Sequence, residues 1–177
     1  MNITYKNITI REARPSDAAQ LCLWWNDGEI MAHAGFPKGL GVKPEVIAQE
    51  IKTQDEKNLR HVIEYEGTLI GEMNYRRVNE EACEIGIKIC DSSRQNRGLG
   101  KIILSLFISE LFNRLGFKKI VLDTDLANLR AQRVYEQLGF EKLRVNQNSW
   151  RDQLGRARSS VDYELTEERF ISYIKAE

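Results

Sequence analysis

The residues best suited to chemistry lie in a short loop, 95–100, which reads Gln-Asn-Arg-Gly-Leu-Gly. A predicted strand, 85–89, precedes this loop, and an apolar predicted helix follows it from Lys101. A glycine loop between a strand and a helix points backbone N–H groups and the positive end of the helix dipole at one spot, which favours phosphate binding. Glycine permits the close approach and left-handed backbone that such a loop needs. Taken alone, the loop is also compatible with an ordinary turn.

A second segment that could do chemistry, 128–140, follows a β-branched predicted strand at 119–124. Asn128 is expected to begin a helix as its N-cap, and Gly139 fits the left-handed position that ends one. Between them lies Tyr135, whose hydroxyl could donate a proton as a general acid. The alternative is a half-buried aromatic side chain of the helix.

The two segments together resemble the GCN5-related N-acetyltransferase (GNAT) superfamily. Gln95, Gly98 and Gly100 fit its pattern Q/R-x-x-G-x-G/A, and residues 128–140 fit N-x-x-A-x-x-x-Y-x-x-x-G-F. The motifs occur in the family's order, about 30 residues apart, and the resemblance covers roughly residues 8–165. The most similar subgroup includes ribosomal-protein and aminoglycoside 6'-type acetyltransferases.

This resemblance implies acetyl transfer from acetyl-CoA to a primary amine of a small molecule or protein N-terminus, by direct attack in a ternary complex. The loop would bind the pyrophosphate, and the edge of the strand at 86–89 would pair with the pantetheine amides. The expected cofactor-binding residues are Ile87, Lys88, Ile89, Gln95, Asn96, Arg97, Gly98, Leu99, Gly100, Lys101, Asn128, Ala131 and Arg133.

Two residues are predicted to be catalytic. Tyr135 would donate a proton to the departing CoA thiolate. Glu84 would accept the proton of the amine, because it alternates with the apolar residues of its strand and so points to the opposite face. A surface charge is the alternative for Glu84, and Glu72 and Asp123 are the other candidates for the base.

The acceptor pocket is expected between the first helix, its following loop and a late polar loop at 146–158. Trp24 and Trp25 are adjacent on a helix and cannot share one face, so one is expected in the core and the other at the pocket. Asp27 and Glu29 could attract an ammonium group or simply cap a helix. The predicted substrate-binding residues are Trp25, Asp27, Glu29, His33, Glu72 and Trp150. No metal-ligand spacing is present, so no metal is predicted.

Composition favours a single domain spanning residues 1–177. The charge is balanced, with 26 basic and 26 acidic residues, which argues against a nucleic-acid partner. The sequence shows no apolar run of about 18 residues and no signal-peptide pattern, so neither a membrane association nor export is expected. Cys22, Cys83 and Cys90 are expected to be buried thiols, and the protein is expected to be cytoplasmic. A homodimer is suggested by the resemblance alone.

The predicted elements place helices between strands in the order β-α-α-β-β-β-α-β-α-β-β. The fold class is therefore α/β, with a mixed sheet covered by helices on both faces. The resemblance implies the GNAT form of this sheet, mostly antiparallel and splayed in its middle. Two other functions stay open: a non-catalytic acyl-CoA-binding sensor or scaffold, and a phosphate-loop nucleotide enzyme. The second is disfavoured because no lysine and serine or threonine follow the last glycine of the loop.

Overall fold

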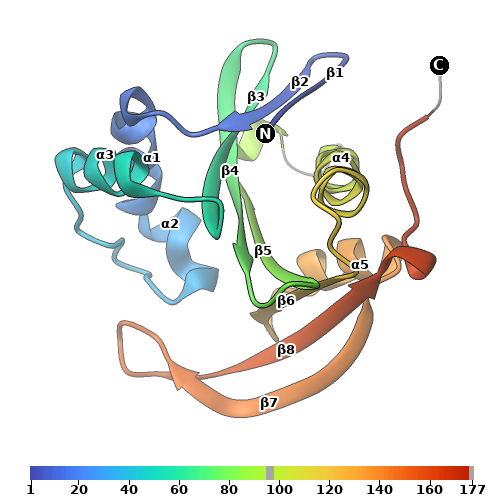
Figure 1. The fold of residues 1–177 in the computed structure, drawn as a ribbon. Coiled ribbons are helices and arrows are strands. Elements are labelled where there is room, and N and C mark those ends of the chain that lie inside the picture. Colours follow the sequence, from blue (N-terminus) through green and yellow to red (C-terminus); the bar gives the residue numbers. More distant parts are fainter. Residues whose placement is uncertain (95–97, 176–177) are drawn as a thin grey trace.

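The computed structural model describes residues 1–94 and 98–175. Within these residues the strands form a single eight-stranded sheet in the order β1-β2-β3-β4-β5-β6-β8-β7 (Figure 1). The strands are β1 (Asn2–Tyr5), β2 (Ile8–Glu12), β3 (Asn58–Tyr65), β4 (Thr68–Arg77), β5 (Ala82–Ile89), β6 (Lys119–Asp125), β7 (Glu141–Arg151) and β8 (Ala157–Thr166).

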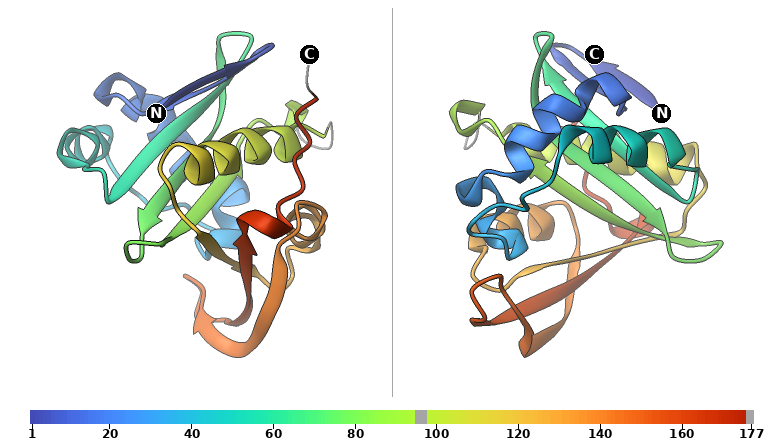
Figure 2. Two further views of the ribbon diagram at one scale, coloured as in Figure 1. Left: turned by 45° about the vertical axis from the view of Figure 1, so that its right-hand side comes forward. Right: turned by 90° about the vertical axis from the view of Figure 1, so that its left-hand side faces the viewer.

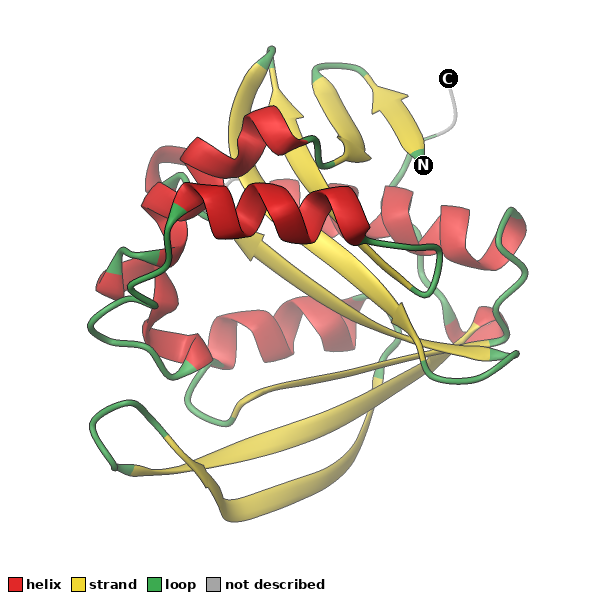
Figure 3. Cartoon of the chain, turned by 60° about the vertical axis from the view of Figure 1, so that its left-hand side comes forward, coloured by secondary structure: helices red, strands yellow, loops and turns green. Residues whose placement is uncertain are grey.

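Helices cover both faces of the sheet, as expected. The α-helices are α1 (Ala18–Trp25), α2 (Gly28–Met31), α3 (Pro44–Thr53), α4 (Leu99–Asn113) and α5 (Leu129–Gln137), and short 3-10 turns include η2 (Ala32–Ala34) and η4 (Glu167–Arg169). Helices α1 and α3 lie across one face, and α4 and α5 lie on the other (Figures 2 and 3). The buried side chains accordingly form two clusters, one on each side of the sheet.

The middle of the sheet is splayed, because β5 and β6 pair over only three residues. They run parallel from Ala82 opposite Lys119 to Glu84 opposite Val121, and then separate. Every other pair of neighbouring strands is antiparallel. This mixed, mostly antiparallel, splayed sheet confirms the predicted fold class.

Turn residues behave as their sequence indicates. Glu66 and Gly67 both have positive φ, 52° and 75°, which is the two-residue turn typical of a β-hairpin. Gly139 has φ 96° at the end of α5, and a Cβ there would lie 1.9 Å from the carbonyl oxygen of Arg169. The left-handed position was predictable, but the contact with the chain 30 residues later was not.

Three elements differ from the sequence-based expectation. Strand β1 and the short helix α2 were not expected. The predicted polar loop at 146–158 is mostly strand, since β7 extends to Arg151 and β8 begins at Ala157. Strand β7 is exposed on both faces along most of its length and is interrupted by bulges, so its sequence lacks the apolar alternation that marks a strand. In the described part of the chain no helix is both long and apolar enough to span a bilayer.

Candidate active site

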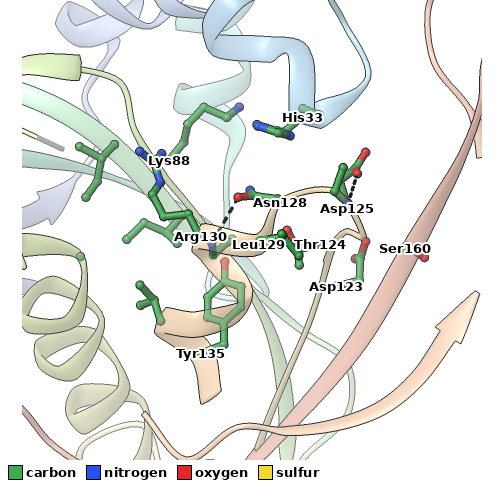
Figure 4. A pocket seen from close by; sticks show the side chains of 18 of the residues that line it. His33, Lys88, Asp123, Thr124, Asp125, Asn128, Leu129, Arg130, Tyr135 and Ser160 are labelled. Atoms are coloured by element: carbon green, nitrogen blue, oxygen red, sulfur yellow. Dashed lines mark hydrogen bonds between the residues drawn. The ribbon is translucent and has the colours of Figure 1, made fainter. Parts of the chain in front are cut away.

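A cavity of about 1190 Å³ opens where β5 and β6 separate. Its walls come from β5, β6, the start of α4, the start of α5, the α2–η2 segment and the β7–β8 hairpin. Figure 4 shows how side chains from these separate elements gather around one space. The splay of the sheet therefore creates the site, since a fully paired sheet would close this opening.

The start of α4 lies at one end of the cavity and is built to receive an anion. Gly98 is the N-cap of the helix with φ 76°, and it has no side chain to bind the first N–H groups. A Cβ at Gly98 would meet nothing within 4 Å, and one at Gly100 would meet only the Ile89 side chain at 3.7 Å. Lys101 also lines this end. Uncapped N–H groups, open space and a nearby ammonium group fit a phosphate.

The start of α5 also lines the cavity. The Asn128 side-chain oxygen accepts a hydrogen bond from the Ala131 N–H at 3.2 Å, so Asn128 is the expected N-cap. Asn128 and Ala131 both line the cavity. Leu99 and Arg133, which were also predicted to bind the cofactor, are not among the lining residues.

The remaining cofactor predictions divide in two. Ile87, Lys88 and Ile89 line the cavity from β5, beyond the last residue that pairs with β6. Gln95, Asn96 and Arg97 lie outside the described residues, so their role stays a prediction.

Tyr135 lines the cavity from α5, with only 7% of its surface exposed. Its ring packs against Phe140 and Tyr163, with centroid distances of 5.6 and 5.9 Å. Figure 4 shows its hydroxyl directed from the helix toward the other labelled residues. Burial, with a smaller contribution from the Asp123 charge, raises the pKa of Tyr135 to about 12. The phenol therefore keeps its proton at neutral pH and can donate it.

The two candidate bases are placed differently. Glu84 points away from the face of its apolar neighbours, as expected, but its carboxylate forms an ion pair with Arg76 and does not line the cavity. Asp123 does line it. Partial desolvation and the like charges of Glu84 and Asp162 raise the pKa of Asp123, and no other described residue forms an ion pair or a hydrogen bond with its carboxylate. Asp123 is thus the better placed of the two.

Glu29, His33 and Trp150 line the other end of the cavity, as expected of substrate-binding residues. Asp27 does not line it. Its carboxylate accepts hydrogen bonds from the N–H groups of Glu29 and Ile30, at 2.8 and 3.3 Å. Asp27 therefore has the capping role that was the alternative for it.

Trp25 and Glu72 do not line the cavity either, which corrects the expected pocket residues. Trp24 and Trp25 are both buried, and neither lines the cavity. The Trp25 indole N–H donates to the Glu72 carboxylate at 2.7 Å, and Arg60 forms an ion pair with the same carboxylate at 2.5 Å. The Glu72 carboxylate thus accepts the hydrogen bond of the buried indole. The sequence alone does not reveal this pairing, because the two residues lie far apart in the chain.

Several lining residues were not predicted. The most informative is Asp125, which is buried and forms an ion pair with Arg158 at 2.5 Å. Its position two residues after Asp123 on a strand, on the same side, was the available signal. Others include Ile30, Ala34, Thr124, Arg130, Ser149 and Ser160. Among the residues that the structure describes, no three His, Cys, Asp or Glu side chains are grouped as metal ligands would be.

Comparison with known proteins gives a consistent answer. The family described as acetyltransferase (GNAT) domain matches residues 7–141. A search among curated proteins found no match. Many solved structures share the fold. One, titled a probable acetyltransferase, has a TM-score of 0.83 at 20% identity and covers 96% of this chain and 99% of its own.

Two further similar structures hold coenzyme A. A spermidine N-acetyltransferase from Vibrio cholerae, in complex with CoA and spermine, has a TM-score of 0.78 at 19% identity, covering 93% of this chain and 98% of its own. RimL, a ribosomal L7/L12 alpha-N-protein acetyltransferase in complex with coenzyme A, has a TM-score of 0.82 at 14% identity, covering 94% and 98%. At these identities the likeness shows a common fold, while the family match extends over most of the chain. The chain belongs to the GNAT acetyltransferase family.

Proposed function

We propose that this chain, an acetyl-CoA-dependent N-acetyltransferase, acetylates a primary amine of a small molecule or a protein N-terminus by direct attack in a ternary complex. One observation carries the proposal. The splay between β5 and β6 brings an uncapped glycine helix start, a protonated Tyr135 and the carboxylate of Asp123 into a single cavity. A site for binding phosphate alone has no use for the last two groups.

The donor is held by the backbone in this proposal. The N–H groups at Leu99, Gly100 and Lys101 bind the pyrophosphate of acetyl-CoA, and the Lys101 ammonium group adds charge. The β5 backbone beyond Glu84, no longer paired with β6, receives the pantetheine arm in the manner of an added strand. A backbone N–H near Ile87 donates to the thioester oxygen and stabilises the negative charge that develops on it.

Asp123 is our choice for the base. An amine arrives largely as an ammonium ion, and a carboxylate without an ion-pair partner both attracts it and can accept its proton. The raised pKa of Asp123 makes it a stronger base than an ordinary aspartate. Glu84 acts on the reaction only through its charge, which contributes to that raised pKa.

Tyr135 is our choice for the acid. The new N–C bond forms as the C–S bond breaks, and the electron pair of that bond passes to sulfur. An ordinary thiol has a pKa of about 8.5, below the value of about 12 for Tyr135. The phenol therefore first stabilises the thiolate by donating a hydrogen bond. A proton released by the attacking amine then converts the thiolate to the free thiol.

The comparisons leave two classes of acceptor open. One similar structure is of a spermidine N-acetyltransferase and another of a ribosomal-protein N-terminal acetyltransferase. A non-catalytic acyl-CoA sensor is the second candidate, and Tyr135 disfavours it because a binding protein needs no acid for a leaving group. Cytoplasmic location and a homodimer stay predictions.

A thiol-release assay tests the proposal. Purified protein with acetyl-CoA is offered putrescine, spermidine, an aminoglycoside and a pentapeptide with a free N-terminus. We expect amine-dependent release of CoA with one of these classes and a product heavier by one acetyl group. Saturable acetyl-CoA binding without release on any acceptor would favour the sensor function.

A further inference from the structure

The β7–β8 hairpin is tied to the loop between α2 and α3, and this tie bears on the acceptor. The Gln153 N–H donates to the Gly35 carbonyl at 2.7 Å. The Gln153 side chain accepts from the Lys38 N–H at 2.9 Å and donates to the Gly39 carbonyl at 2.9 Å. We call these three hydrogen bonds the Gln153 clasp.

Trp150 strengthens the same junction. A Cβ built on Gly35 would lie 2.5 Å from the Trp150 ring, so the indole rests directly on the glycine backbone. Gly35 is buried and has φ 94°, so the junction requires glycine for two reasons. The Arg158 guanidinium group lies over the same indole, 5.6 Å from the ring centre.

Hydrogen bonds within the hairpin tip itself hold the turn that contacts the α2–α3 loop. The buried Asp152 carboxylate accepts from the N–H groups of Leu154 and Arg156, at 2.9 and 3.0 Å. The Asp152 N–H donates to the Arg156 carbonyl at 3.0 Å. Gln153 is therefore presented by an ordered turn. Figures 1 and 3 show the hairpin tip beside the α2–α3 loop in two different views.

The two segments joined by the clasp are the two walls of the acceptor end. Glu29, Ile30, His33 and Ala34 line the cavity from one wall, and Ser149 and Trp150 line it from the other. An extended polypeptide lying between these walls would have to displace the hydrogen bonds of the clasp, which join them. A small amine needs no such passage.

Charge at this end favours a cation. Glu29 and Asp123 both line the cavity, and neither has an ion pair with another residue in the part of the chain that the structure describes. The other lining carboxylate, Asp125, is already neutralised by Arg158. Lys88 also lines the cavity, but its ammonium group lies 3.9 Å from the Glu72 carboxylate, outside the cavity lining. Glu29 and Asp123 are thus the lining carboxylates that form no ion pair with another described residue.

Taking the proposed acetyl transfer as given, we infer that the Gln153 clasp restricts the acceptor to a small cationic amine and excludes a protein N-terminus. Gln153 is a specificity-determining residue in this account. It acts by holding the walls together, not by contacting the reacting atoms.

Gln153→Ala removes both side-chain bonds of the clasp and leaves the hairpin turn intact. Gln147→Ala is the matched control, because Gln147 is an exposed glutamine of the same hairpin whose side chain, among the described residues, bonds only to Ser159. Each protein is assayed with putrescine and with the pentapeptide Ala-Ala-Ala-Ala-Lys. The wild type and control should acetylate putrescine and leave the peptide N-terminus unmodified. In Gln153→Ala the putrescine KM should rise about 10-fold, with an unchanged Kd for acetyl-CoA.

A second readout does not depend on activity. Amide hydrogen exchange at Lys38 should be slow in the wild type and control, and about 10-fold faster in Gln153→Ala. Equal exchange rates at Lys38 in all three proteins would overturn the clasp. Efficient acetylation of the peptide N-terminus by the wild type would overturn its role in selection. Absence of acetyl-CoA binding, by contrast, would refute the proposed function. The hydrogen-exchange rate at Lys38 would then still show whether the clasp exists.

Discussion

Tyr135 and Asp123 come from a helix and a strand, and both line the cavity between the separated strands. Each has a raised pKa, and the charge of Asp123 contributes to that of Tyr135. The charge of Asp123 therefore makes deprotonation of Tyr135 less favourable. Their assigned roles as base and acid can be tested separately.

Tyr135→Phe should lower kcat by about 100-fold or more, because the departing sulfur loses its hydrogen-bond donor. The ring contacts with Phe140 and Tyr163 are kept, so the Kd for acetyl-CoA should stay within about twofold of the wild-type value. Steady-state kinetics with a parallel binding titration make this comparison. Wild-type turnover in the variant would rule out the acid role.

Asp123→Asn should lower kcat/KM by about 100-fold and remove the acidic limb of the pH profile. Glu84→Gln is the informative companion. It removes a like charge that raises the pKa of Asp123, so the acidic limb should move to lower pH while the maximal rate is kept. A loss of activity in Glu84→Gln as large as in Asp123→Asn would instead return the base role to Glu84.

His61 makes stability dependent on pH. It is fully buried between Tyr75 and Phe107, and its ring nitrogens have no hydrogen-bond partner within the described chain. Burial, aided by the N-terminal charge, lowers its pKa from 6.5 to about 4. Between these values the unfolded chain binds more protons, so the free energy of unfolding falls as the pH falls.

The expected loss from His61 between pH 7 and pH 4.5 is about 2–3 kcal/mol. His61→Leu should remove that part of the acid sensitivity. Denaturant unfolding of both proteins at the two pH values measures the difference. An equal loss in His61→Leu would show that other groups cause it.

At the scale of residues, the sequence showed which side chains could do chemistry, but it did not show which other side chains they would contact. Asn128 and Gly139 could be assigned from local rules because caps depend on their own helix. Trp25 and Glu72 could not, because the hydrogen bond that removes them from the pocket joins α1 to β4. The position of Glu84 outside the cavity lining was likewise not predictable, since its ion pair with Arg76 depends on strand register.

At the scale of elements, the start of α4 carries the anion-binding proposal. Gly98→Ala should weaken acetyl-CoA binding by about 10- to 100-fold, because the new Cβ occupies the space that the phosphate needs. Gly116→Ala is a matched control. Gly116 lies just beyond the other end of α4 with φ 73°, and like Gly98 it is exposed, with open space where a Cβ would be.

Both alanine variants should lose a similar stability, roughly 1–2 kcal/mol, from the left-handed backbone. Calorimetric titration with acetyl-CoA then separates a local effect on binding from general destabilisation. Equal affinities in the two variants would remove the α4 start from the site.

Helices and strands whose apolar residues recur at a regular spacing were predictable, and solvent-exposed elements were not. Helix α4 and strand β5 lie within a few residues of their predicted limits, because their apolar residues pack against the core. Strand β7 is mostly solvent-exposed, so its hydrogen bonds to β8 define it and its sequence does not. The hairpin tip that contacts the α2–α3 loop was consequently expected to be part of a polar loop.

At the scale of the molecule, the catalytic cavity is a consequence of incomplete strand pairing. The order of elements and the two motifs were sufficient to predict the splayed sheet through the family resemblance. The closure of the acceptor end was not predictable, because it depends on hydrogen bonds between residues more than 100 positions apart, such as Gln153 and Lys38. The donor half of the site thus follows from local motifs, and the acceptor half from long-range contacts.

The most direct test of the account is a calorimetric titration of acetyl-CoA into the wild-type protein. We predict saturable binding with one acetyl-CoA per chain, weakened by Gly98→Ala and unchanged by Gly116→Ala. Absence of binding by the wild-type protein would contradict the assignment of this cavity as the acetyl-CoA site and, with it, the proposed reaction.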